Sequence, residues 1–180
     1  NGLQSLTPVQ KDIRVLGTAF DKAGNLWLNN ARVNKAFKVL KLNNQWASYN
    51  VENIFSVPFE LVYNDVVIDR ADVKWFATYG GLVAFDDKTN VMKLISADES
   101  QGNLPSNDVR ALAIDNRNQI WIGTNRGLRI LSSTDRFSSD NALTTNPIII
   151  LEEGLAQELL YQQFITDIKV DGANNKWIGT

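Results

Sequence analysis

The sequence has 180 residues, a formal net charge of −2, and neither histidine nor cysteine. A chain of this length suits one domain and can bury roughly 70% of its unfolded surface. Without these two residue types, the chain itself cannot supply a Ser-His-Asp triad, thiolate chemistry, disulfides or His- and Cys-based zinc sites. Lys and Arg form no cluster and no run of about 20 apolar residues occurs, so neither a nucleic-acid surface nor a transmembrane segment is expected.

A tryptophan recurs along the chain with an aspartate six positions before it. The pairs are Asp21/Trp27, Asp69/Trp75, Asp115/Trp121 and Asp171/Trp177. The tryptophans of successive pairs are 48, 46 and 56 residues apart. Four copies at one offset define an internal repeat.

Each copy predicts a hairpin. Apolar residues alternate before the aspartate, which indicates a strand with one buried face. The residues one and three positions before it are Phe20/Thr18, Ile68/Val66, Ile114/Leu112 and Val170/Ile168. The aspartate then predicts a type I turn, because its side chain can accept backbone N–H bonds. Three residues later stand types that tolerate the left-handed backbone conformation, namely Gly24, Asp72, Asn118 and Asn174. We expect each tryptophan to pack between neighbouring hairpins rather than to bind sugar.

Further strands follow the hairpins in chain order. The segment "QWASYN" predicts a fourth strand in the first copy, "LVAFDD" and "VMKLIS" complete the second, and "LRILSS" extends the third. Four antiparallel strands per repeat are typical of a propeller blade. We therefore predict an all-β fold over 1–180, with about 3.5 blades of a larger β-propeller and blade cores near 13–49, 63–96, 108–137 and 164–180. Propellers close with roughly 4–8 blades, so open apolar end faces predict self-association.

An insertion at 138–163 separates the last two copies. We expect it to include a short helix around Leu155–Tyr161. The apolar run "NPIIIL" leaves open whether the insertion is a decorated loop or an element that docks a partner.

The turns "TYGGL" and "TNRGL" between second and third strands carry the candidate ligand-binding residues, which are Tyr79, Asn125 and Arg126. Plain hairpin turns are the alternative. No catalytic residue, cofactor or metal site is predicted: the aspartate turns lack the EF-hand pattern, and adjacent carboxylates such as Glu152 and Glu153 suit paired-carboxylate hydrolysis poorly.

The stretch "VRALAIDNRNQIWIGTNRGLRIL" resembles the two-component regulator propeller repeat. The best copies are 63–86, 104–132 and 164–180. The first copy departs from the pattern, with Leu28-Asn29-Asn30 and Ala31-Arg32-Val33 in place of the Ile-Gly-Thr and Gly-Gly-Leu segments. The resemblance implies an exported protein, at the cell surface or in the periplasm of a Gram-negative, Bacteroidetes-type bacterium.

Three functions are compatible with this resemblance. The segment "NPIIILEEGLAQELLYQQFITDIKVDGANNKWIGT" is similar to PorZ-like components of type IX secretion, which implies a non-catalytic propeller that binds a glycan or lipopolysaccharide and partner proteins. The alternative is the periplasmic glycan-sensing region of a hybrid two-component histidine kinase. A third function, that of a propeller lyase acting on streptogramins, is disfavoured because those enzymes depend on histidine.

Overall fold

The computed structural model describes residues 2–5, 7, 9, 12–55, 63–138 and 143–180 as an all-β arrangement of antiparallel sheets. The first sheet contains β1 (Val15–Phe20), β2 (Leu26–Asn30), β3 (Phe37–Leu40) and β4 (Trp46–Tyr49). The second contains β5 (Tyr63–Ile68), β6 (Lys74–Thr78), β7 (Gly81–Asp86) and β8 (Val91–Ile95). The third contains β9 (Val109–Ile114), β10 (Ile120–Thr124) and β11 (Gly127–Leu131), and the last pairs β14 (Asp167–Val170) with β15 (Lys176–Gly179). Within the described residues, the 3-10 helices η2 (Glu99–Gln101) and η3 (Asp135–Ser138) lie in the connections between strands.

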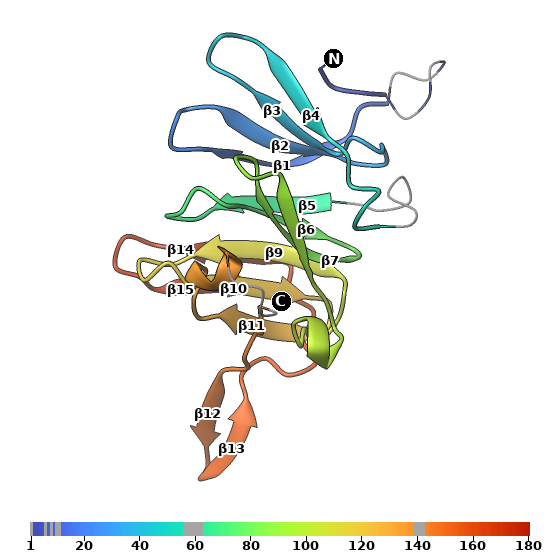
Figure 1. Ribbon diagram of the computed structural model, residues 1–180. Helices are drawn as coiled ribbons and strands as arrows, with labels where there is room; N and C mark the ends of the chain where they lie inside the picture. Colours follow the sequence, from blue (N-terminus) through green and yellow to red (C-terminus); the bar gives the residue numbers. More distant parts are fainter. Residues whose placement is uncertain (1, 6, 8, 10–11, 56–62, 139–142) are drawn as a thin grey trace.

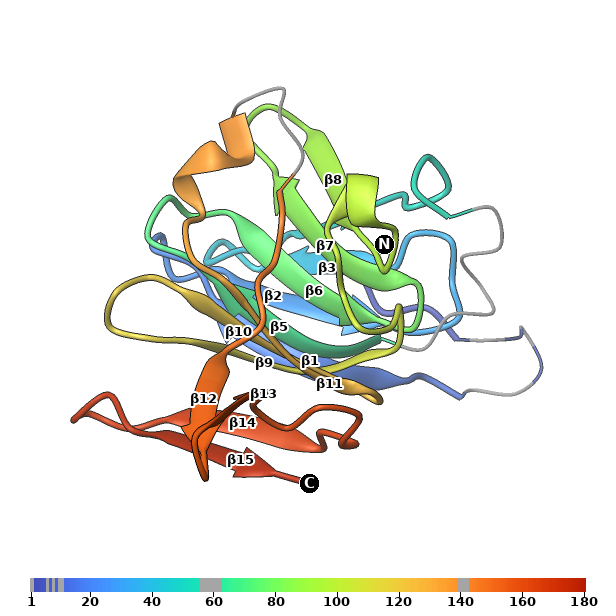
Figure 2. The ribbon, with the colours of Figure 1, turned by 90° about the horizontal axis from the view of Figure 1, so that it is seen from below.

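The sheets follow one another as propeller blades do, with their first strands adjacent. β1 packs beside β5, β5 beside β9 and β9 beside β14. Figure 1 shows the first three sheets below one another in chain order, and Figure 2 shows β14 and β15 on the far side of the third. A Cβ added to Gly17 of β1 would lie 2.8 Å from the backbone of Asp65 in β5, so only glycine allows these strands to approach so closely. The predicted all-β propeller segment is confirmed.

The insertion before the last sheet is a hairpin and not a helix. Strands β12 (Ile149–Glu152) and β13 (Leu155–Glu158) pair with Glu152 opposite Leu155. The two residues between them, Glu153 and Gly154, have φ of 51° and 80°, as the common two-residue hairpin turn requires. The predicted helix around Leu155–Tyr161 is therefore wrong, because this turn reverses the chain. The hairpin projects away from the sheets (Figure 1), while residues 139–142 of the predicted insertion lie outside the described residues.

The six-residue offset between aspartate and tryptophan reflects a direct hydrogen bond. In every copy the indole Nε1 donates to the aspartate Oδ2, at 2.9, 3.1, 3.3 and 3.2 Å in chain order. The other carboxylate oxygen accepts backbone N–H groups two and four residues further on, as at Asp115 with Arg117 (2.9 Å) and Gln119 (3.0 Å). The aspartate thus closes the turn and orients the indole ring at the same time.

The same turns also tie each sheet to the next. The residue after the aspartate donates its N–H to the side chain three positions after the next aspartate. The pairs are Lys22 to Asp72 (3.3 Å), Arg70 to Asn118 (3.0 Å) and Asn116 to Asn174 (3.0 Å). The three acceptors have φ of 71°, 63° and 69°, so the predicted left-handed positions are confirmed and carry a second role.

Replacing Asn118 separates these two roles. Asn118→Gly keeps the left-handed turn but removes the acceptor for Arg70 and the bond to Thr134 (2.7 Å), so we expect a loss of about 1–2 kcal/mol in unfolding free energy. Asn118→Ala should lose roughly 1 kcal/mol more, because a Cβ disfavours this conformation. Urea unfolding measures both losses, and an alanine variant as stable as the glycine variant would contradict this account.

The tryptophans followed by a three- or four-stranded sheet are buried, whereas Trp121, followed by the two-stranded last sheet, is half-buried. Trp27 and Trp75 are 1% and 0% exposed, whereas Trp177 is 66% exposed because no described sheet follows it. The opposite face of the first sheet is likewise uncovered, so that Thr18 is exposed and Phe20 is 71% exposed. The burial predicted for these two residues is therefore wrong. The prediction is confirmed for Val66 and Leu112, which occupy the position of Thr18 in the second and third copies.

Candidate functional site

The turns that carry Tyr79, Asn125 and Arg126 are built alike. Thr78 and Thr124 donate their hydroxyls to the carbonyls of Gly81 (2.7 Å) and Gly127 (3.0 Å). The same hydroxyls accept the N–H groups of Gly80 (3.0 Å) and Arg126 (3.1 Å). Gly81 and Gly127 have φ of 128° and 132°, which side chains rarely adopt. The threonine and the glycine of the repeat therefore hold the residues between them in fixed positions.

The structure places two of the three predicted residues beside one arginine of β9. Tyr79 is 37% exposed, and its ring centroid lies 5.0 Å from the guanidinium carbon of Arg110. Asn125 donates its backbone N–H to the carbonyl of Asp108 (3.1 Å), two residues before Arg110. Arg126 is exposed, and no contact joins its side chain to these residues.

Arg110 joins three neighbouring blades. Its guanidinium carbon also lies 4.6 Å from the ring centroid of Phe164, in the loop before β14, and Phe164 is 45% exposed. Residues from the second, third and fourth sheets thus form one group, which we call the Arg110 cluster: Tyr79, Asp108, Arg110, Asn125 and Phe164. Stacking of a guanidinium on aromatic rings leaves a flat surface that combines positive charge with ring faces.

An ion pair holds Arg110 in this position. Its Nη2 and Nε lie 2.6 and 3.1 Å from one oxygen of Asp108. This hydrogen bond raises the pKa of Arg110, and the Asp108 charge and Tyr79 add to the effect against partial burial. The arginine is therefore fixed as a cation between two exposed rings.

Two buried oxygen atoms of the cluster have no hydrogen-bond donor within the described part of the chain. They are Asp108 Oδ1 and Asn125 Oδ1. Buried acceptors in folded proteins are nearly always paired, so such atoms call for a donor from water or a ligand.

Arg110, Asp108 and Phe164 were not predicted as site residues. One signal was available, because the position five before the aspartate varies in character among the copies, whereas the positions one and six before the aspartate are apolar or aromatic in all four. Its occupants are Leu16, Asn64, Arg110 and Thr166. A position that departs from a structural repeat indicates a local role, but the contact of Arg110 with Tyr79 and Phe164 requires the order of the blades in space.

The described residues hold no group of three or more Asp or Glu side chains arranged to bind a metal ion. Nor does the described part of the chain contain a helix long and apolar enough to cross a membrane.

The third blade matches a known repeat. The sequence model of the family "Two component regulator propeller" matches residues 103–126, which span the loop before β9, the aspartate turn and the turn at Asn125. Over these residues the chain is similar to the two-component regulator propeller repeat. Within this repeat, the Asp115–Trp121 bond and the Thr124 hydroxyl explain why Asp, Trp, Thr and Gly recur at set positions.

Three known proteins are similar to this chain in sequence or in fold. Histidine kinase P4 of Formosa agariphila is 34% identical over 87 residues, which cover 46% of this chain and 6% of the kinase. The structure of PorZ, a surface component of the type IX secretion system of Porphyromonas gingivalis, superposes with a TM-score of 0.79 at 21% identity, over 98% of this chain and 25% of PorZ. The extracellular domain of a protein described as a hybrid two-component system from B. thetaiotaomicron gives 0.62 at 19% identity, over 92% of this chain and 20% of that domain. The chain thus spans a quarter or less of each relative.

Proposed function

We propose that this chain is part of an exported, non-catalytic propeller that binds a cell-surface glycan or lipopolysaccharide, as a PorZ-like component of type IX secretion. The Arg110 cluster carries the proposal, because it offers two exposed rings and a fixed cation at one place. Aromatic faces and hydrogen-bonding groups of this kind recognise sugar rings, and a cation suits the anionic groups of lipopolysaccharide.

The fold similarity supports the choice of PorZ. Its superposition extends over 98% of this chain with a TM-score of 0.79, and its surface location fits an exported protein. Partner proteins would belong to the same machinery. The exposed ring of Trp177, on the end face beyond the fourth sheet, favours association with further blades or with other copies.

The second candidate function is a glycan sensor in a hybrid two-component kinase. The 34% identity with Histidine kinase P4 over 87 residues favours it. If this chain belongs to such a sensor, the Arg110 cluster would bind soluble oligosaccharides, and ligand binding would be transmitted through the packing between propellers.

Binding to the Arg110 cluster is tested with purified Porphyromonas gingivalis lipopolysaccharide and with soluble oligosaccharides. Arg110→Gln removes the charge and the stacked guanidinium, so we expect the dissociation constant for lipopolysaccharide to rise about tenfold, measured by titration calorimetry. Arg117→Gln, an exposed arginine in the aspartate turn of the same blade, is the matched control and should bind like the unaltered chain. Equal affinities of both variants would refute a role for the cluster, and tight binding of oligosaccharides without lipopolysaccharide binding would favour the sensor.

A further inference from the structure

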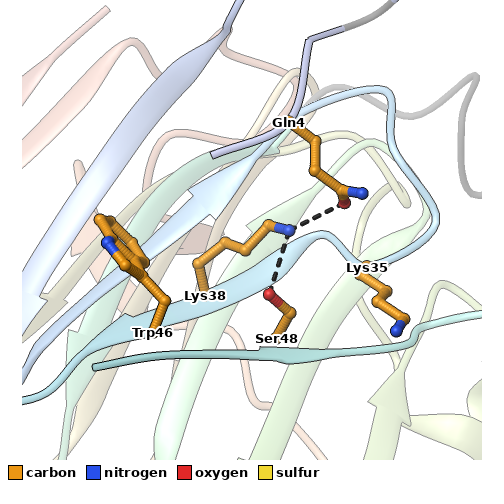
Figure 3. A pocket seen from close by; sticks show the side chains of 5 residues that line it. All are labelled: Gln4, Lys35, Lys38, Trp46 and Ser48. Carbon is orange, nitrogen blue, oxygen red and sulfur yellow. Dashed lines mark hydrogen bonds between the residues drawn. The ribbon is translucent and has the colours of Figure 1, made fainter. Parts of the chain in front are cut away.

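A hollow lies on the outward side of the first sheet, away from the Arg110 cluster. It has a volume of about 220 Å³ and is lined by Gln4, Lys35, Lys38, Trp46 and Ser48 (Figure 3). Phe37 and Val39 of β3 pack against the second sheet, so Lys38 between them points to the opposite side. The N-terminal segment crosses this side, where the backbone N–H of Gln4 donates to Asn30 Oδ1 (2.7 Å).

Lys38 is buried in this hollow without an acidic partner. Lys38 is 1% exposed, and its Nζ donates to Gln4 Oε1 (2.8 Å) and Ser48 Oγ (3.1 Å). Both acceptors are neutral. An ammonium group has three N–H bonds, so one remains for a further acceptor.

Other lysines in protected positions of this fold are neutralised. The buried Lys74 pairs with Asp72 (3.3 Å) and Asp87 (2.5 Å), and Lys176 pairs with Asp115 (3.2 Å). Among the described residues no ion pair includes Lys38 or Lys35. A buried charge without a counter-charge is unfavourable unless something else compensates it.

The surroundings of Lys38 increase this imbalance. Burial lowers its pKa to about 8, and the positive charge of Lys35, in the turn between β2 and β3, acts in the same direction. Besides Lys38, the charged residue that lines the hollow is Lys35, because Gln4, Trp46 and Ser48 are neutral. An anion in the hollow would offset both positive charges. Trp46 is half-buried at the wall of the hollow, on the side of the Lys38 stem away from its ammonium group (Figure 3).

We propose that this hollow binds an oxyanion, a carboxylate or a phosphate, carried on a sugar ring, with Lys38 and Lys35 contacting the anion and Trp46 contacting the ring. The sugar part rests on the proposed glycan binding, whereas the anion site does not. The hollow would then be a second point of contact for an acidic glycan.

The test titrates the ¹⁵N-labelled chain with glucuronate, glucose 6-phosphate, inorganic phosphate and glucose at constant ionic strength. The indole N–H signal of Trp46, assigned with Trp46→Phe, reports occupancy. We expect both sugar anions to bind more tightly than inorganic phosphate, and glucose not to bind. A preference for glucuronate or for glucose 6-phosphate identifies the natural anion as a carboxylate or a phosphate.

Lys38→Gln should weaken binding of the sugar anions at least about tenfold, while Lys41→Gln, an exposed lysine just beyond β3, should leave it unchanged. In the unaltered chain the affinity for the sugar anions should fall as pH rises through about 8, because Lys38 then loses its proton. This second measurement does not depend on whether Lys38→Gln folds. Unchanged affinity in folded Lys38→Gln, or binding that is constant from pH 7 to 9.5, would overturn the anion site. Inorganic phosphate binding as tightly as the sugar anions would overturn the sugar part. The Trp46 signal reports the hollow that this residue lines, which keeps this test independent of the Arg110 cluster.

Discussion

Trp75→Ala should lower the free energy of unfolding by about 3–5 kcal/mol. The ring of Trp75 is fully buried between the second and third sheets, in a core that includes Leu112 and Ile120. Its removal leaves a cavity and also deprives Asp69 Oδ2 of its indole donor, at 3.1 Å, in a residue only 3% exposed. For a chain of this size the melting temperature should fall by roughly 10 °C. Urea unfolding followed by circular dichroism measures the loss.

The chain supplies its own control at the same position of the repeat. Trp177 makes the same hydrogen bond, to Asp171 Oδ2 at 3.2 Å, but is 66% exposed. Trp177→Ala should therefore cost less than about 1 kcal/mol. Similar losses for the two variants would show that burial between sheets does not determine the role of these tryptophans.

Trp75→Phe separates the two contributions at Trp75. It keeps an aromatic ring and loses the indole donor, so a loss of about 1–3 kcal/mol is expected. A loss as large as that of the alanine variant would assign most of the effect to the hydrogen bond.

The sequence was sufficient for the blades, because their signals are local. The alternation before each aspartate, the turn and the left-handed residue all lie within ten positions, and the backbone angles of Asp72 and Asn118 agree with them. Exposure of Phe20 was not predictable from that pattern. It depends on whether another sheet covers the first one, which is a property of the array rather than of the copy.

The candidate site depends on contacts between blades that a repeat pattern does not contain. Tyr79 could be selected because it lies in an exposed turn, but Arg110 is a residue of a strand, and its partners come from the preceding and following blades. Lys38 likewise occupies an alternating position in β3 that would suit an apolar residue. Its hollow exists because Gln4 crosses the outward side of the sheet, and this crossing has no sequence signal.

Asp115→Asn should cost about 2–4 kcal/mol at neutral pH, because Asp115 joins two blades through four hydrogen bonds. It is 5% exposed, its Oδ1 accepts the amides of Arg117 and Gln119, and its Oδ2 accepts Trp121 Nε1 (3.3 Å) and Lys176 Nζ (3.2 Å). An asparagine has one acceptor oxygen, so its NH₂ group would face donors either at the amides or at the indole and ammonium.

The pH dependence of this loss distinguishes the carboxylate from simple packing. Burial alone would raise the pKa of Asp115, but the hydrogen bonds from Gln119, Arg117, Lys176 and Trp121 together lower it below the ordinary value of 3.8. A carboxylate with a lowered pKa stabilises the fold above its unfolded value, and this contribution is lost as pH falls through the folded value. The unaltered chain should therefore approach the stability of Asp115→Asn as the pH is lowered from about 5 towards 2.

Asp171→Asn is the matched control, since Asp171 makes the same turn and the same bond to its tryptophan at the uncovered end. Water reaches this turn, and within the described residues no following blade supplies a lysine to it. The loss of unfolding free energy in Asp171→Asn should therefore be clearly smaller than in Asp115→Asn. Urea unfolding at pH 7, 5 and 3 compares the two variants. A difference between Asp115→Asn and the unaltered chain that stays constant over this range would mean that the carboxylate charge does not join the third and fourth blades. Lys176 would then be held by its hydrogen bond to the Asn174 carbonyl (2.8 Å) and by its contact with the Trp121 ring (4.9 Å).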